Sequence, residues 1–100
     1  MSRVLEVTES DDQQKVLKSS PKVVVFYGSK RCPHCVDMED VFENLSRKYR
    51  KVLFVHVETT QIKVDNITGV PVFDIYRNGE MIDAIMGARK EALQEAVARL

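Results

Sequence analysis

The chain has 100 residues, of which 44% are hydrophobic and 30% charged, and this composition predicts one globular domain over residues 1–100. Lys and Arg number 15, as do Asp and Glu, so the formal net charge is zero at pH 7. A neutral chain argues against nucleic-acid binding, which needs basic side chains to neutralise phosphates, and against charge-driven membrane association. No apolar run approaches the roughly 20 residues that a membrane-spanning helix needs.

The first ten residues, Met-Ser-Arg-Val-Leu-Glu-Val-Thr-Glu-Ser, lack the apolar stretch of a secretory signal. They are also too acidic for a mitochondrial transit peptide. We therefore expect a cytoplasmic protein, or a mitochondrial or periplasmic one if a leader has been removed.

The first part of the chain predicts a strand, a helix and a second strand. Residues 3–7 suit a short edge strand, and Thr8 or Ser10 can cap a helix that runs to about Ser19. Residues 22–27, Lys-Val-Val-Val-Phe-Tyr, are typical of a strand that is buried on both faces.

A longer helix is predicted to begin near Cys32. Pro33 is tolerated in its first turn, where a backbone N–H would have no helical partner. Apolar residues then recur at helical spacing and predict a core-facing stripe of Met38, Val41, Phe42, Leu45 and Tyr49. The basic residues at 47–51 suit a solvated face that complements the helix dipole.

The second half predicts a strand at 52–57, one or two helical turns at 61–67, and strands at 72–76 and 81–85. Asn78-Gly79 between the last two is a strong hairpin signal, because both residue types accept a positive φ. A final amphipathic helix follows Gly87. The order βαβαβαββα predicts an α/β fold with a mixed central sheet and helices on both faces.

The only two cysteines, Cys32 and Cys35, enclose Pro33 and His34 at the predicted helix start. A helix N-terminus carries partial positive charge, which stabilises a thiolate, the reactive form of cysteine. The Lys-Arg pair at 30–31 and a protonated His34 add to this charge. Cys32 is therefore the expected nucleophile, stabilised as a thiolate by His34, and Cys35, one turn deeper, is the expected resolving thiol.

The cysteine pair has two other possible functions, a zinc site and a structural pair of thiols. A zinc site needs four ligands, and this pair supplies two; the only other histidine, His56, lies in a predicted strand. A structural pair of thiols is the second alternative, although a bridge across two residues closes too short a loop to add much stability. The position between a buried strand and an amphipathic helix favours redox chemistry with no cofactor beyond a Cys32–Cys35 disulfide.

From residue 3 to residue 100 the sequence resembles the thioredoxin family. The matching segments are the Val-Val-Val-Phe-Tyr strand before the cysteines, Gly-Val-Pro-Val-Phe-Asp-Ile-Tyr-Arg-Asn-Gly-Glu at 69–80, and Met-Gly-Ala-Arg-Lys-Glu-Ala-Leu at 86–93. The resemblance implies the thioredoxin fold and dithiol–disulfide exchange with protein disulfides through a mixed disulfide. It also implies a thiol reductant or reductase as electron partner, and a monomer.

The same resemblance implies a substrate-binding surface. Pro71 matches a cis proline that faces the cysteines, and Val70 matches the residue whose backbone pairs with the substrate. Gly87 matches a glycine that lines the substrate groove, and Arg31 stands where the family has tryptophan. From the residues alone, Pro71 equally suits the start of a strand, and Gly87 a turn before the last helix.

The chain departs from the family beneath the cysteines. Thioredoxins bury an aspartate there, and with one inserted residue before Cys32 that position is Val25; the lysine paired with it aligns with His56. The group that deprotonates Cys35 therefore stays open between His56, His34 and a buried water. His56 equally suits a hydrogen-bonded core histidine.

Two alternative functions remain. Cys-Pro-X-Cys also resembles glutaredoxins, which use glutathione, although residues 86–90 match their glutathione-carboxylate segment poorly. The other alternative is a non-catalytic thioredoxin-fold module that binds a partner or bridges a metal cluster between two subunits.

Overall fold

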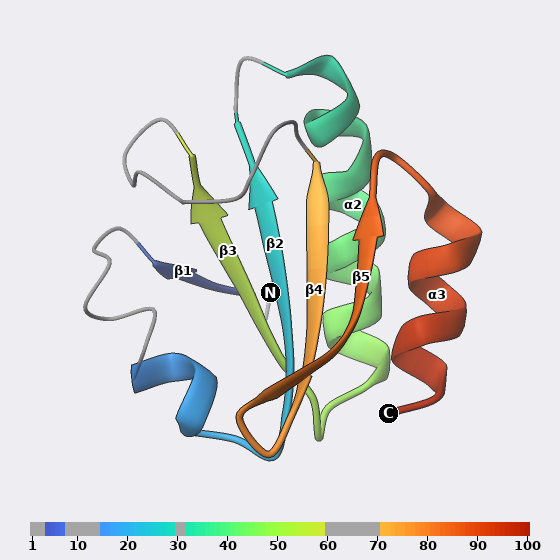
Figure 1. Ribbon diagram of the computed structural model, residues 1–100. Coiled ribbons are helices and arrows are strands. Elements are labelled where there is room, and N and C mark those ends of the chain that lie inside the picture. The colour runs from blue at the N-terminus through green and yellow to red at the C-terminus, as the bar shows by residue number, and fades with distance from the viewer. Residues whose placement is uncertain (1–3, 8–14, 30–31, 60–70) are drawn as a thin grey trace.

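The computed structural model describes residues 4–7, 15–29, 32–59 and 71–100, which form a sheet with helices on both faces (Figure 1). The strands are β1 (Val4–Val7), β2 (Lys22–Gly28), β3 (Leu53–Glu58), β4 (Val72–Arg77) and β5 (Glu80–Met86). The helices are α2 (Pro33–Lys48) and α3 (Lys90–Ala98), and residues 15–18 are also helical. The predicted capping residues Thr8 and Ser10 and the predicted helix at 61–67 lie outside the described residues.

The strand order is β1-β3-β2-β4-β5. β1 and β2 both pair with β3 in parallel, whereas β4 pairs antiparallel with β2 and with β5. The mixed sheet and the edge position of the first strand are as predicted. β2 therefore lies at the centre of the sheet, and the chain that leaves its carboxyl end passes directly into α2.

Side chains of β2 alternate between two core layers. Val24 and Phe26 pack on the side of α2 and α3, whereas Val23, Val25 and Tyr27 pack on the opposite side, where Leu17 covers the sheet. This two-sided burial explains the continuous apolar run in the sequence, because neither face of the strand meets water.

The layer beneath α2 is built around aromatic rings. The ring of Phe26 stacks on that of Phe73 with centroids 4.7 Å apart, and it meets the edge of Phe42 at 5.2 Å. Phe42 in turn contacts Phe54 at 5.2 Å. Each such pair adds about 0.5–1.5 kcal/mol beyond its burial, so this cluster fixes α2 against the strands that lead to its N-terminus.

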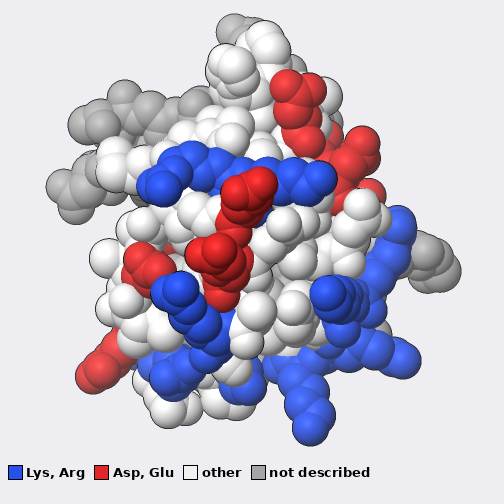
Figure 2. All heavy atoms as spheres, turned by 90° about the vertical axis from the view of Figure 1, so that its right-hand side faces the viewer, with Lys and Arg blue, Asp and Glu red and all other residues white. Residues whose placement is uncertain are grey.

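Helix α2 buries the predicted stripe: Met38, Phe42 and Leu45 are buried, and Val41 and Tyr49 pack partly buried against them. Its basic end is solvated, as predicted, since all four lysines and arginines at 47–51 are exposed. Figure 2 shows one band of Lys and Arg side chains across the upper half of the face covered by α2 and α3 and a larger group toward its lower end. That end is opposite to the start of α2, so this charge is remote from the cysteines.

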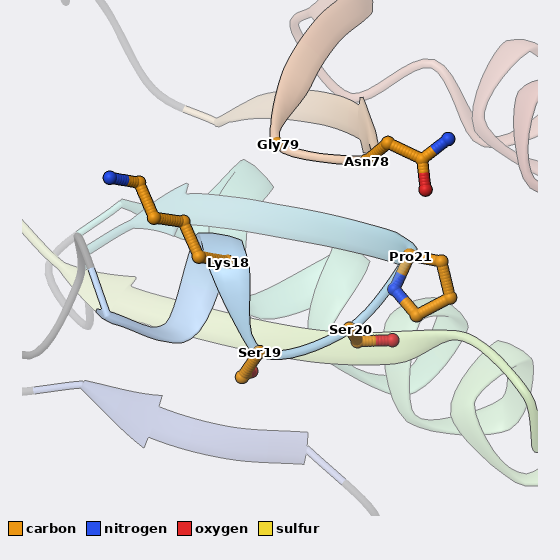
Figure 3. Close-up of a pocket in the computed structure, with 6 residues that line it drawn as sticks. All are labelled: Lys18, Ser19, Ser20, Pro21, Asn78 and Gly79. Atoms are coloured by element: carbon orange, nitrogen blue, oxygen red, sulfur yellow. The ribbon is translucent and has the colours of Figure 1, made fainter.

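The predicted hairpin turn is present, since Asn78 has φ 53° and Gly79 has φ 83°. Beside it lies a hollow of about 380 Å³ (Figure 3). It is lined by Lys18, Ser19, Ser20, Pro21, Asn78 and Gly79. These residues carry no thiol, imidazole or carboxylate, and they lie at the amino end of β2, away from the cysteines. The hollow is therefore separate from the candidate active site.

Candidate active site

Cys32 caps the amino end of α2. Its extended backbone, with φ −99° and ψ 113°, lets its carbonyl accept hydrogen bonds from the N–H groups of Cys35 and Val36, both at 3.1 Å. The N–H of Cys35 also donates to the Cys32 sulfur at 3.3 Å. A backbone N–H directed at sulfur stabilises a thiolate, and the helix dipole acts in the same direction. The sequence thus places a thiol where a capping oxygen would normally lie.

The residues between the cysteines expose their side chains. Pro33 is the first residue of α2, as predicted, and His34 follows it on the surface. The first turn of α2 contains no acidic residue, so no carboxylate there opposes a negative charge on Cys32. Lys30 and Arg31, the other predicted sources of positive charge, lie outside the described residues.

Cys35 differs from Cys32 in burial and in protonation. It is 1% exposed and belongs to the core layer beneath α2, whereas Cys32 is partly exposed. Burial, together with the hydrogen bond to Cys32, raises the pKa of Cys35 from 9.0 to about 12. The negative charges of Cys32 and Glu58 act in the same direction, against a hydrogen bond from the Ser29 backbone. Cys35 is therefore a protonated thiol at neutral pH.

The prediction that Val25 occupies the position beneath the cysteines is wrong. Val25 packs in the opposite core layer, whereas Phe26 shares the layer of Cys35. A Cβ built on Gly28 would lie 3.5 Å from the Cβ of Cys35, so the first turn of α2 lies against this end of β2. Even-numbered residues of β2 face α2, and none of them carries a carboxylate.

His56 is hydrogen-bonded within the core. Its Nδ1 lies 2.6 Å from Oε2 of Glu6, and its ring centroid lies 4.9 Å from that of Phe26. Because a carboxylate only accepts hydrogen bonds, Nδ1 carries the donated proton. This geometry supports the core-histidine interpretation, in which His56 links β3 to β1 through Glu6.

Pro71 and Gly87 lie at the same end of the sheet as the cysteines. Tyr27 pairs with Val72, and Val72 with Met86, so the residues next to these pairs gather beside Gly28 (Figure 1). The buried Pro71 accepts a hydrogen bond from the Gly87 N–H at 2.8 Å.

Glycine at position 87 is explained by its backbone. Its φ is 91°, a conformation that side chains disfavour, and a Cβ built there would meet no atom of the described residues within 4 Å. Val70, Arg31 and the Val70–Pro71 peptide bond lie outside the described residues, so the predicted cis bond stays a prediction.

Among the described residues, no group of three or more His, Cys, Asp or Glu side chains converges in a way that could hold a metal ion. No helix in the described part of the chain is both long and apolar enough to cross a bilayer.

Glu58, at the carboxyl end of β3, is a residue of this site that was not predicted from the sequence. It is 7% exposed, although glutamate is rarely buried. The alternation of β3 could have indicated it, because Glu58 falls two residues after His56 and four after Phe54 and so shares their face of the strand.

A buried strand, a cysteine that caps the next helix and a shielded second thiol one turn later define a dithiol–disulfide exchange site. The thioredoxin family model matches residues 3–99. Thioredoxin-3 of Dictyostelium discoideum is 31% identical over 101 residues, covering 97% of this chain and 96% of its own. Thioredoxin 1 of Plasmodium falciparum is 26% identical, covering 93% of each chain.

The solved structure of Plasmodium falciparum thioredoxin superimposes with a TM-score of 0.89 at 25% identity, covering 95% of this chain and 97% of that one. The chain belongs to the thioredoxin family. The predicted thioredoxin fold is thereby confirmed, and so is the predicted activity, that of a thiol–disulfide oxidoreductase.

Proposed function

We propose that the protein exchanges electrons with protein disulfides, with Cys32 as the nucleophile and Cys35 as the resolving thiol. The observation that carries this assignment is the difference between the two sulfurs. Cys32 is accessible and accepts a backbone N–H at the start of α2, whereas Cys35 is buried and protonated. One sulfur is thus prepared to attack, and the other is held back until a mixed disulfide has formed.

The reduction of a substrate disulfide proceeds in two exchanges. The Cys32 thiolate attacks one substrate sulfur, a Cys32–substrate disulfide forms, and the first substrate thiolate leaves. Cys35 then loses its proton and attacks the Cys32 sulfur. The Cys32–Cys35 disulfide forms, the second substrate thiolate leaves, and two electrons have passed to the substrate. An external thiol reductant or reductase reverses these steps to restore the dithiol, and no further cofactor is needed.

The substrate chain would dock on the surface around Cys32. Pro33 and Gly87 adjoin it, and Val70, Pro71 and Arg31 are proposed to complete it. Two exposed apolar side chains, Val36 at 48% and Met86 at 64%, lie at the same end of the molecule and add apolar contact area. We place this activity in the cytoplasm, with the protein acting as a monomer.

Reduction of insulin disulfides tests this function. Catalytic amounts of the protein should cause insulin to precipitate when a thioredoxin reductase with its nicotinamide cofactor supplies electrons. It should do so much more slowly with glutathione and glutathione reductase. Turnover that depends on glutathione alone would support the glutaredoxin alternative, and no turnover with either system would support a non-catalytic module. A Cys32→Ala variant serves as the inactive control.

Removing the linker histidine should make the protein more reducing. A protonated His34 stabilises the Cys32 thiolate and hence the reduced form, which raises the reduction potential of the disulfide. His34→Ala should lower that potential, by at most about 30 mV because the side chain is exposed to solvent and screened.

Equilibration with glutathione redox buffers measures this potential. His34→Gln is the control for side-chain bulk without a titratable charge, and it should behave as His34→Ala does. A potential that is the same in all three proteins would show that His34 does not contribute to thiolate stabilisation.

A further inference from the structure

A buried carboxylate lies at the end of the strand next to the resolving cysteine. Glu58 is the last residue of β3, and in the parallel ladder it is the partner of Gly28, the last residue of β2. Neighbouring strands in a sheet are about 4.8 Å apart. Gly28 has no side chain, and the position of an added Cβ lies 2.7 Å from the ring of Phe26 and 3.5 Å from the Cβ of Cys35, so both residues pack against this end of β2.

Glu58 faces the same side of the sheet as Cys35. Along β3, Phe54 and His56 lie on the α2 side, where they contact Phe42 and Phe26, whereas Val55 and Val57 belong to the opposite layer. The strand period of two places Glu58 with the former pair. Its charge reaches the thiol, since it contributes to the raised pKa of Cys35.

We propose that Glu58 accepts the Cys35 proton when Cys35 attacks the mixed disulfide, and returns that proton when the site is reduced. The inference rests on the proposed function, because it concerns the second exchange only. The Cys35 S–H bond breaks and the proton moves to the carboxylate. The sulfur electron pair forms the bond to Cys32, and the Cys32–substrate bond breaks with its electrons leaving on the substrate thiolate. Glu58 keeps the proton until the site is reduced again.

A base at this position resolves the difficulty that the raised pKa of Cys35 creates. A thiol with a pKa of about 12 is almost fully protonated at neutral pH, and it must lose its proton in order to attack. Ionisation beside a fixed carboxylate would place two negative charges together, whereas transfer to that carboxylate leaves the charge of the pair unchanged. The other buried titratable candidate, His56, lies two residues earlier on β3, opposite Phe26 rather than Gly28, and its Nδ1 is hydrogen-bonded to Glu6.

Substituting Glu58 would affect the second exchange in two opposite ways, by removing a charge that repels the Cys35 thiolate and by removing the base. In Glu58→Gln the repelling charge is gone, so the pKa of Cys35 should fall. If Glu58 acted only as a charge, the second exchange would then be faster. If Glu58 takes the proton, the second exchange should be slower by about tenfold to a hundredfold, since positioned bases commonly contribute at least this much.

Stopped-flow mixing of the reduced protein with an aromatic disulfide whose thiolate absorbs visible light separates the two exchanges. The first burst depends on reagent concentration and reports attack by Cys32. The second burst does not depend on it and reports resolution by Cys35. Glu58→Gln should leave the first burst unchanged and slow the second. Its second rate should also rise about tenfold per pH unit, because solvent then takes the proton.

Two further variants complete the test. Glu58→Met fills the same space without a buried polar group and should behave as Glu58→Gln does, so either variant that folds is informative. Asp74→Asn removes a half-buried carboxylate on the opposite face, at the position paired with Val25, and should change neither burst. A second burst as fast as in the unchanged protein, or faster, in a folded Glu58 variant overturns the proposal. Absence of the first burst in the unchanged protein would instead contradict the proposed function.

Discussion

Replacing Cys35 by serine should leave the protein covalently joined to its substrate through Cys32, with catalytic turnover lost. The first exchange needs only the Cys32 thiolate, whose backbone partners at the start of α2 do not depend on the Cys35 sulfur. A serine hydroxyl cannot attack a disulfide at neutral pH, so the mixed disulfide would persist. Insulin reduction should fall below detection, and mass spectrometry after tryptic digestion should find the substrate chain on Cys32.

The reciprocal variant is the control. Cys32→Ser should form almost no adduct, because Cys35 is buried and stays protonated at neutral pH. Both variants should unfold near the temperature of the reduced parent protein, since serine is close to cysteine in size and neither variant removes a covalent bond that the reduced fold contains. Adducts that accumulate on Cys35 in Cys32→Ser, with none on Cys32 in Cys35→Ser, would reverse the assignment of nucleophile and resolving thiol.

The reduced protein should lose stability as the pH rises above about 9, whereas the oxidised protein should not lose it for this reason. The pKa of Cys35 is about 12 in the folded protein, against 9.0 for an unperturbed cysteine thiol. Between these values the unfolded chain gives up the Cys35 proton and the folded chain keeps it. The contribution of the neutral buried thiol is therefore complete below the lower pKa and is lost as the pH rises toward the higher one.

Urea unfolding at a series of pH values measures this loss. The limiting slope from one such group is about 1.4 kcal/mol per pH unit. The oxidised protein has no Cys35 thiol to titrate, and Cys35→Ala in the reduced state removes the same group, so both should show a shallower decline. Parallel curves for all three proteins from about pH 9 to pH 11 would mean that Cys35 ionises in the fold as readily as in the unfolded chain.

The elements that rest on a local pattern could be predicted from the sequence. The apolar run at 22–27 specified a strand buried on both faces, and the spacing of Met38, Phe42 and Leu45 specified the buried side of α2. The positive φ values of Asn78 and Gly79 followed from residue type alone. In each case neighbours in sequence carry the determining interaction.

The features that the sequence analysis missed depend on pairing between distant segments. Val25 was assigned to the wrong face because a single inserted residue, placed in the strand or after it, reverses the facing of every side chain. Glu58 was overlooked because a glutamate at a strand end usually meets water. Glu58 is nevertheless buried, and its partner in the ladder is Gly28, thirty positions earlier in the chain.

Cys35 packs among Met38, Phe42 and the neighbouring core residues, and this packing gives the two chemically identical cysteine side chains different reactivities. In an unfolded chain, two thiols three positions apart are nearly interchangeable, and either would attack a disulfide with similar probability. The order of events, attack first and resolution second, is therefore a property that only the folded state possesses. Folding breaks the symmetry of the pair, and any variant that loosens the core around α2 should blur that order before it abolishes the sulfur chemistry itself.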